Sequence, residues 1–248
     1  MKVRYRYRIY PTDPQKTALA KLFGCCRVVF NDALAFCHEN YKQGNKFIGY
    51  NQWSKSLTQV KKTEEREWLT EVSSIPLQQS LQDLKTSFKN FFDSRKGKRK
   101  GKKVNPPKFK KRKSKQSARF MDNGFKVNED SVYLAKIGNL KIVWSRELPS
   151  QPSSVTVVKD AAHRYFLSFV CEVNHPQLPN NSQSVGIDLG ITDFATLSTG
   201  EKIKAPKPLK RQLKRLRRLQ KNLSRKQKGS KRREVTRLKV AKLHAKIA

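Results

Sequence analysis

The stretch that decides the fold is Ser184-Val185-Gly186-Ile187-Asp188-Leu189-Gly190, in which one carboxylate stands inside an apolar run. A short apolar run bounded by glycines is typical of a buried strand. An unpaired carboxylate that is buried away from water carries a large free-energy cost. We therefore expect Asp188 to have a ligand, such as a metal ion or a phosphate site.

The residues around this stretch predict an antiparallel meander. Its strands would be Val185–Leu189, Phe194–Ser198 and a short one at Lys202–Ile203. In ribonuclease-H-like folds, an acid on the first strand joins further carboxylates in holding two divalent ions across a scissile phosphate. The pentapeptide Gly-Ile-Asp-Leu-Gly also resembles the phosphate loop of the actin and sugar-kinase superfamily, although Ile191 stands where that loop has a hydroxyl residue.

The charge of the chain points to a polyanionic partner. The 248 residues carry a formal net charge of +36, which is far outside the range of an ordinary enzyme. Clustered Lys and Arg side chains release condensed counterions from phosphates and give salt-dependent binding. No apolar run approaches the roughly 20 residues that span a bilayer, and the basic N-terminus lacks the apolar core of a signal peptide. We therefore expect a cytoplasmic protein with no membrane partner.

The cysteines do not predict a metal site. Cys25, Cys26, Cys37 and Cys171 include no Cys-x-x-Cys pair, so we expect no zinc site built from this chain alone. Cys26 and Cys37 fall on an apolar helical face, where a free cysteine behaves as a small hydrophobe. Core packing is the interpretation that this pattern favours.

The first hundred residues predict a strand followed by an all-helical block. Lys2–Tyr10 alternates between apolar and basic residues, which is typical of a strand with a basic outer face. Apolar residues three and four apart then predict a helix between Thr12 and Gly44. Further helices are predicted over 51–62, 64–72 and 76–94. Gln78 and Lys85 on the last of these could reach base edges or phosphates, or could form a solvated polar face.

The composition changes at Arg95, where a run of about twenty residues without any acid begins. Such a run repels itself into an open loop, and we expect it to contact phosphates. Short strands divided by turn signals follow between Ser117 and Val173, in the pattern of a β-barrel that the N-terminal strand would complete. Residues 174–183 have the composition of a linker.

The last 43 or so residues predict a basic helical hairpin over 206–248. Leucines from Leu209 to Leu223 form an apolar seam, Gly229-Ser230 interrupts it, and a second seam is predicted on Val235, Leu238 and Ala241. The outer faces carry many cations and the single acid Glu234. Contact with a nucleic-acid backbone is favoured over coiled-coil pairing, which would need an acidic partner.

Several separated stretches together resemble one known family. Gly186-Ile-Asp-Leu-Gly-Ile-Thr-Asp-Phe-Ala-Thr-Leu-Ser-Thr-Gly200 closely resembles the first RuvC segment of the TnpB (OrfB) proteins of bacterial insertion sequences, which are relatives of type V CRISPR nucleases. The resemblance continues, in the same order along the chain, in Arg8-Ile-Tyr-Pro11, Val28-Val-Phe-Asn31, Leu77-Gln-Gln-Ser-Leu81 with Phe88-Lys-Asn-Phe91-Phe92, and Pro107-Lys-Phe109-Lys-Lys.

This resemblance implies an α+β multidomain fold. A wedge-like β-barrel would comprise 1–10 and 97–173, with a helical recognition block inserted at 11–96. The linker 174–183 would lead to the N-terminal part of a RuvC-like, ribonuclease-H-like nuclease domain at 184–248. The implied activity is cleavage of DNA that is chosen by a guide RNA, next to a short DNA motif, with DNA and guide RNA as partners.

The resemblance also assigns roles to individual residues. Asp188 matches the first catalytic carboxylate and ligand of Mg²⁺ (or Mn²⁺), and Tyr50, Ser54 and Gln78 fall in segments resembling the part that contacts DNA beside the target. The basic loop would contact RNA or heteroduplex through Lys98, Arg99, Lys100, Lys102, Lys103, Lys108, Lys110, Lys111 and Arg112. The hairpin would contribute Lys210, Arg211, Lys214, Arg215 and Arg218.

The chain departs from the family pattern after Asp188. A RuvC site also needs a later glutamate and a final aspartate, and the family has a zinc ribbon between them, whereas the acids that follow here are Asp193, Glu201 and Glu234. We therefore expect a fragment or a truncated product that binds nucleic acid and does not cut it alone. Three hypotheses remain: part of an RNA-guided endonuclease, a non-catalytic binding module or regulator of the mobile element, and a ribosomal-type RNA-binding protein.

Overall fold

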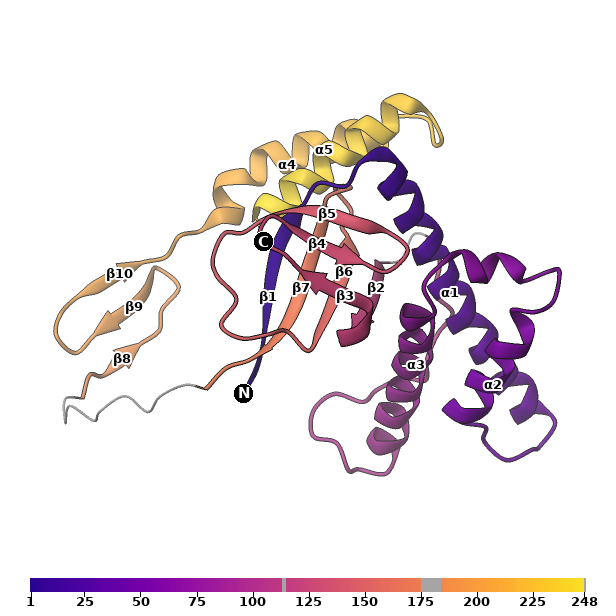
Figure 1. Cartoon of the computed structure of the whole chain (residues 1–248). Helices are drawn as coiled ribbons and strands as arrows, with labels where there is room; N and C mark the ends of the chain where they lie inside the picture. The colour runs from indigo at the N-terminus through magenta and orange to yellow at the C-terminus, as the bar shows by residue number, and fades with distance from the viewer. Residues whose placement is uncertain (113–114, 175–183, 248) are drawn as a thin grey trace. The chain divides into compact units, whose positions relative to one another are not determined.

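Seven antiparallel strands form the main sheet in a computed structural model that describes residues 1–112, 115–174 and 184–247 (Figure 1). The strand order is β2-β6-β7-β1-β5-β4-β3, so the N-terminal strand lies inside the sheet. The strands are β1 (Lys2–Ile9), β2 (Gln116–Met121), β3 (Phe125–Val127), β4 (Ser131–Leu134), β5 (Gly138–Val143), β6 (Ser154–Lys159) and β7 (Tyr165–Glu172). A short 3₁₀ turn, η2 (Asp122–Gly124), joins β2 to β3.

The alternation of apolar and basic residues along β1 explains its place in this sheet. β1 pairs with β7 along its whole length, from Lys2 opposite Glu172 to Ile9 opposite Tyr165, and its end also pairs with β5. Tyr7 and Ile9 are buried in the core, while Arg8 between them points to the other face. The prediction that the N-terminal strand completes the later strands is therefore confirmed.

A helical block lies between β1 and β2. It comprises α1 (Asp13–Lys42), α2 (Tyr50–Val60), η1 (Glu67–Glu71) and α3 (Ser74–Arg95). In α1, Gln15 accepts a hydrogen bond from the Thr12 backbone N–H at 3.0 Å, and proline at the second position suits a helix start. The predicted helix at 64–72 is wrong, because this polar stretch forms turns and one short 3₁₀ helix. Leu69 and Val72 are its two buried apolar side chains, which is too few to form the apolar face of a longer helix.

A second compact unit contains a small meander and two helices. Its antiparallel strands are β8 (Ile187–Asp188), β9 (Asp193–Leu197) and β10 (Lys202–Lys204), in the order β10-β9-β8. Its helices are α4 (Pro208–Ser224) and α5 (Lys231–Ile247), which pack as a hairpin around Leu216, Val240 and Leu243. The predicted meander and hairpin are both confirmed.

The prediction of which side of α5 is buried is wrong. Val235 is about half exposed, whereas Thr236, Val240 and Leu243 are buried. The Arg233 guanidinium donates to the backbone carbonyls of Leu223 and Lys226 at the end of α4. Residues 236, 240 and 243 lie on the same helical face as residue 233, so this contact fixes the rotation of α5.

At the level of fold class, the chain is α+β with a mostly antiparallel sheet and several helices, as expected. The narrower assignments to a wedge-like barrel, an inserted recognition block and a RuvC-like domain stay predictions. Most of the predicted linker, residues 175–183, lies outside the described residues. Within the described part of the chain, every helix is too short or too polar to cross a membrane.

Candidate nucleic-acid interface

Asp188 lies on an exposed edge strand. In the part of the chain that the structure describes, β8 pairs with β9 alone, which places the exposed residue Asp188 opposite Thr196. Ile187 and Leu189 are 59% and 71% exposed. The expectation of a buried strand is therefore wrong for this chain, because in the described residues β8 has a partner strand on one side only.

The described residues do not build a divalent-metal site. Among residues 1–112, 115–174 and 184–247, no three His, Cys, Asp or Glu side chains come together as a group that could hold a metal ion. Asp188 offers a single carboxylate, whereas a two-metal nuclease site requires several. The four cysteines are all buried as free thiols: three lie in α1, and Cys171 lies in β7.

Tyr50, Ser54 and Gln78 come together on the helical block. The Tyr50 hydroxyl donates to Gln78 Oε1 at 2.9 Å, and the Ser54 hydroxyl donates to the same oxygen at 3.2 Å. Tyr50 and Ser54 lie one turn apart on α2, and Gln78 lies near the start of α3. All three are partly exposed, and the Lys85 ammonium lies 5.8 Å from the centroid of the Tyr50 ring.

These bonds orient the carboxamide of Gln78. Because Oε1 accepts both hydroxyl bonds, Nε2 is the side-chain atom of Gln78 that can donate to a ligand. A fixed amide donor beside a lysine suits a base-edge acceptor next to a phosphate. The structure thus joins three residues that the sequence placed up to 28 positions apart.

The basic loop after α3 is anchored at its beginning. The Lys98 backbone N–H donates to the Asp93 carbonyl at 2.9 Å, and the Val104 N–H donates to Ser94 Oγ at 3.0 Å. Most of the predicted phosphate contacts in the loop are exposed, namely Lys98, Arg99, Lys100, Lys102, Lys103, Lys108, Lys111 and Arg112. Arg99 also donates to Asn90 Oδ1 at 2.8 Å.

Lys110 differs from the other cations of this loop. Its ammonium lies 3.9 Å from the centroid of the Phe30 ring, and its backbone is bonded to the side chain of Asn31. Burial lowers the pKa of Lys110, although Asp83 and Cys26 act in the opposite direction. The position of Lys110 is therefore that of a packed residue, and its predicted contact with phosphate stays a prediction.

The helical hairpin presents a second basic surface. All of its predicted contacts are exposed on α4, namely Lys210, Arg211, Lys214, Arg215 and Arg218. At the start of this helix, the Lys207 ammonium donates to the Thr192 carbonyl at 3.2 Å. This bond ties the meander to the hairpin within the second unit.

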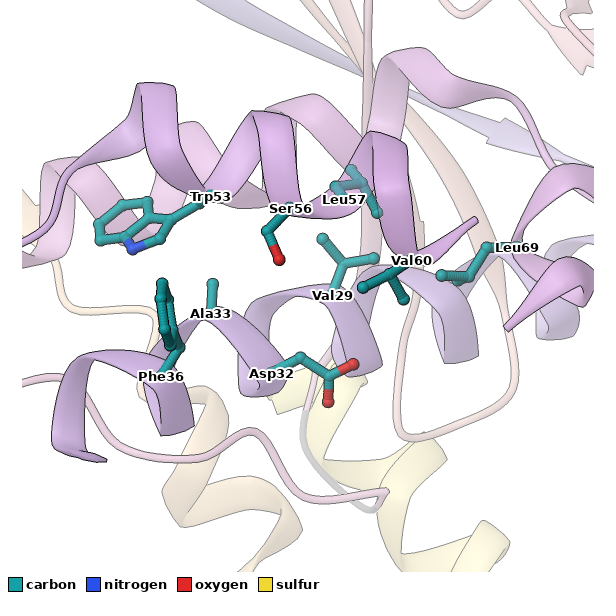
Figure 2. A pocket seen from close by; sticks show the side chains of 9 residues that line it. All are labelled: Val29, Asp32, Ala33, Phe36, Trp53, Ser56, Leu57, Val60 and Leu69. Carbon is teal, nitrogen blue, oxygen red and sulfur yellow. The ribbon is translucent and has the colours of Figure 1, made fainter. Parts of the chain in front are cut away.

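The helical block also contains a small apolar pocket (Figure 2). Its volume is about 60 Å³, and it lies between α1 and α2 with Leu69 at one end. Asp32 lies at the pocket and is 3.2 Å from Arg66. Burial raises the pKa of Asp32 while Arg66 opposes the shift. The lining is mainly aliphatic and aromatic, which is typical of a packing gap between helices.

Comparison with known proteins agrees with the resemblance seen in the sequence. A family model described as a probable transposase matches residues 168–248, and one described as a helix-turn-helix domain matches residues 1–46. A Streptomyces pristinaespiralis protein is 43% identical over 251 residues. It is named as a proposed RNA-guided DNA endonuclease. Both family models and this relative thus point to the TnpB (OrfB) family, the family that the sequence resembles.

A second TnpB relative shows the same extent of likeness. The Escherichia coli K12 protein InsQ, also named as a proposed RNA-guided DNA endonuclease, is 34% identical over 247 residues. The alignments cover 100% and 98% of this chain but 60% and 59% of the two relatives. The chain therefore spans about 60% of the length of the curated TnpB relatives that it matches.

Sequence reasoning predicted the strand and the helix within residues 1–46 but missed the role of Asn31 in the interface. In residues 1–46, one family model names a helix-turn-helix, whereas this chain forms β1 and the single helix α1 there. Asn31, which holds the basic loop, was noted only as part of a resembling segment. The sequence feature that could have indicated this role is a polar amide next to Phe30 in a helix with many apolar residues. A partly buried amide needs a hydrogen-bond partner, but the sequence does not identify that partner.

Proposed function

We propose that this chain is the nucleic-acid-binding part of a TnpB-type RNA-guided DNA endonuclease and that it contributes the first catalytic carboxylate. The names of the two relatives support this proposal, as does the net charge of +36. The proposed partners are a guide RNA and DNA, and the proposed place of action is the bacterial nucleoid in the cytoplasm. In this proposal, residues 1–10 and 97–173 form the wedge-like barrel, and 11–96 form the recognition block.

The oriented amide of Gln78 is the observation that carries this proposal. A glutamine on a purely solvated face has no need of two hydroxyl donors, whereas a base-reading amide must be held in one orientation. Tyr50 and Ser54 supply that orientation through bonds of 2.9 and 3.2 Å. The neighbouring Lys85 supplies positive charge for the adjacent phosphate.

The proposed role of Asp188 depends on carboxylates from outside the described residues. In the proposed nuclease domain, Asp188 would be one ligand of a Mg²⁺ (or Mn²⁺) site at the edge strand β8. The described residues supply no group of three ligands, so we expect this chain to bind nucleic acid without cutting it. Its basic loop and hairpin would hold the RNA and the heteroduplex through their phosphates.

Selection of DNA from a random duplex library tests the proposed readout. We expect the chain to enrich a short motif and Gln78→Ala to lose preference at one position, by about 1 to 3 kcal/mol. The matched control is Gln59→Ala, which removes an exposed glutamine near the end of α2 that is not part of the cluster. Enrichment of the same motif by the Gln78 variant would contradict the assignment.

A chimera tests the catalytic proposal. The chain is fused to the remaining part of the 43% identical Streptomyces relative, and Mg²⁺-dependent cleavage of guided DNA is measured. Asp188→Asn should abolish cleavage without changing DNA binding, whereas Glu201→Gln, at an exposed acid before β10, should leave cleavage intact. Cleavage that survives Asp188→Asn would remove the residue from the site.

A non-catalytic regulator of the mobile element is the second candidate. The absence of a three-ligand group from the described part of the chain favours it. The two candidates differ in the chimera, because a chain specialised for binding alone would not restore cleavage when the missing carboxylates are supplied. DNA selection cannot separate them, since both require a sequence-preferring surface.

A further inference from the structure

The pocket between α1 and α2 has a buried floor and an exposed rim (Figure 2). The rim includes the Phe36 ring, which is 44% exposed, together with Asp32 and Ser56, which also reach solvent. A closed packing gap would have no exposed rim, so this pocket can be entered from outside. The floor consists of buried side chains, namely Val29, Ala33, Trp53, Leu57 and Leu69.

The volume of the pocket, about 60 Å³, limits what can enter it. A water molecule needs roughly 10 to 15 Å³ of such space, and an engineered cavity of about 150 Å³ holds benzene. The pocket is therefore too small for a nucleobase and matches the end of one aliphatic side chain. Because the floor is aliphatic and aromatic, an apolar group gains more by entering it than water does.

The surface around the pocket lacks the excess of cations that the rest of the chain carries. The nine lining residues include one acid, Asp32, and no lysine or arginine. Residues 61–71, which border the pocket through Leu69, carry four acids and three bases, whereas the whole chain has a net charge of +36. This surface therefore gives phosphates no electrostatic attraction.

Three glutamates near the pocket are available to a cationic partner. Glu64, Glu65 and Glu67 are exposed, and they form no ion pair within the part of the chain that the structure describes. The bases next to them do not cancel this availability, because Arg66 pairs with Asp32 at 3.2 Å instead. Charge complementarity thus favours a partner with lysine or arginine at this place.

An exposed aromatic ring also lies next to the pocket in the chain. Trp68 directly precedes Leu69 of the floor and is 37% exposed. Its indole N–H donates to the Glu65 carbonyl at 2.9 Å, and the Arg66 guanidinium lies 5.8 Å from its ring centroid. The ring is therefore held at the surface, together with Phe36 on the rim. Aromatic residues held in this way are enriched in the cores of protein–protein interfaces.

We infer that this pocket is a docking site for a partner protein that inserts one aliphatic side chain and carries lysine or arginine beside it. The aliphatic side chain would fill the pocket, and the cations would face Glu64, Glu65 and Glu67. A helix that lays an apolar anchor into a groove between two helices is a recurring mode of protein recognition. This role is separate from nucleic-acid binding and does not rest on the proposed function.

Selection from a phage library of short random peptides tests the chemistry of the partner. The full chain is used as bait after copurified nucleic acid has been removed. Because its net charge is +36, non-specific attraction would enrich acidic peptides. We expect instead a distinct group of peptides in which leucine, isoleucine or valine lies next to lysine or arginine. Recovery of acidic peptides alone would overturn the inference.

Variants of the chain place the selected peptide in the pocket. Ala33→Leu fills the pocket from α1 and should weaken peptide binding about tenfold, because the aliphatic anchor loses its buried site. Ala33→Val fills less of the space and should give a smaller loss, which keeps the test valid if the leucine variant does not fold. The matched control is Ala20→Leu, at an exposed position of the same helix. Equal binding by all of these chains would contradict the inference.

A second set of variants tests the charge complementarity. Glu64→Gln, Glu65→Gln and Glu67→Gln together should weaken peptide binding about threefold, the size expected of exposed ion pairs. The difference should disappear at high salt, because exposed charges are screened there. A loss that is the same at every salt concentration would show that the glutamates do not act through their charge.

Fluorine NMR locates the bound peptide without relying on affinity. The chain has three tryptophans, which 5-fluorotryptophan labels together. Peptide should shift the resonances of Trp53 and Trp68, whereas Trp144, whose ring centroid lies 4.8 Å from that of Tyr7 in the sheet, should not respond. A shift of Trp144 alone would overturn the inference. So would concentration-dependent shifts of Trp53 and Trp68 without peptide, which would assign the pocket to a second copy of the chain.

The docking site and the proposed DNA readout can fail separately. Gln78→Ala should leave peptide binding unchanged, because Gln78 does not line the pocket. Saturation with duplex DNA should leave the peptide bound for the same reason. Displacement of the peptide by DNA would mean that nucleic acid occupies the pocket, and would overturn the inference.

Discussion

Asn31 and Lys110 are joined by a pair of hydrogen bonds between side chain and backbone. Asn31 Nδ2 donates to the Lys110 carbonyl at 3.0 Å, and the Lys110 backbone N–H donates to Asn31 Oδ1 at 2.8 Å. The two residues are 79 positions apart, so this pair ties the end of the basic loop to the middle of α1. The loop therefore leaves the helical block at a fixed point.

Asn31→Ala should loosen the end of this loop. Both bonds are partly buried, and loss of a partner that leaves buried backbone groups unpaired costs about 1 to 3 kcal/mol. We expect a lower free energy of unfolding and faster proteolysis after the lysines of residues 108–112. Asn45→Ala, at an exposed amide after α1, is the control. Unchanged proteolysis in the Asn31 variant would show that other contacts hold the loop.

Lys108 and Lys110 should differ in their effects on nucleic-acid binding. Lys108 is exposed, whereas the Lys110 ammonium rests on the Phe30 ring. Lys108→Met should reduce the salt slope of duplex DNA binding by about 0.9, the value for one phosphate contact. Lys110→Met keeps the aliphatic packing and should leave that slope nearly unchanged. The reverse order of slopes would mean that Lys110 leaves Phe30 when nucleic acid binds.

Leu216 should hold the basic hairpin together. It is 6% exposed and packs with Val240 and Leu243, whereas Leu209 on the same helix is 52% exposed. Burial of a leucine side chain in such a small core supports about 2 kcal/mol, at the low end of the range for Leu→Ala changes. Leu216→Ala should therefore reduce the amide hydrogen-exchange protection of α4 and α5, and Leu209→Ala should have little effect. Equal loss in both variants would contradict this packing.

The elements that could be predicted from the sequence are those whose own pattern decides their structure. The alternation of Lys2–Tyr10 fixed which side of β1 faces the core, because a strand exposes every second residue. The position of Asp188 could not be obtained in this way. An apolar run reports a preference for burial, whereas burial itself needs a second surface, and β8 has only β9 beside it in the described residues.

In the candidate site too, some features follow from the local sequence and others depend on contacts between distant segments. The exposure of most lysines and arginines in the basic loop follows from composition, since a run without acids repels itself into an open loop. The contacts of Asn31, Gln78 and Arg233 depend on segments that meet only after folding. Arg233 sets the rotation of α5 through bonds to carbonyls up to ten residues away, which no helical periodicity of α5 itself contains.

The buried thiol of Cys26 should make folding sensitive to alkaline pH. Burial raises the pKa of Cys26 from an ordinary value of 9.0 to about 12, and its thiol donates to the Pro76 carbonyl at 3.6 Å. The folded state thus holds its proton more tightly than the unfolded state. This contribution to stability is complete below the unfolded pKa and is lost as the pH rises toward the folded pKa.

Urea unfolding at a series of pH values measures this effect as a difference between the natural chain and Cys26→Ala. Between the unfolded and folded pKa values, the difference should change by up to about 1.4 kcal/mol per pH unit, because one proton is bound in the folded state only. Lysine deprotonation also changes stability in this range, but it is common to both proteins and cancels. Cys171→Ala, at another buried thiol whose pKa is raised by burial, tests whether the effect belongs to the sheet instead. A pH-independent difference for Cys26→Ala would mean that solvent reaches the thiol in the folded chain.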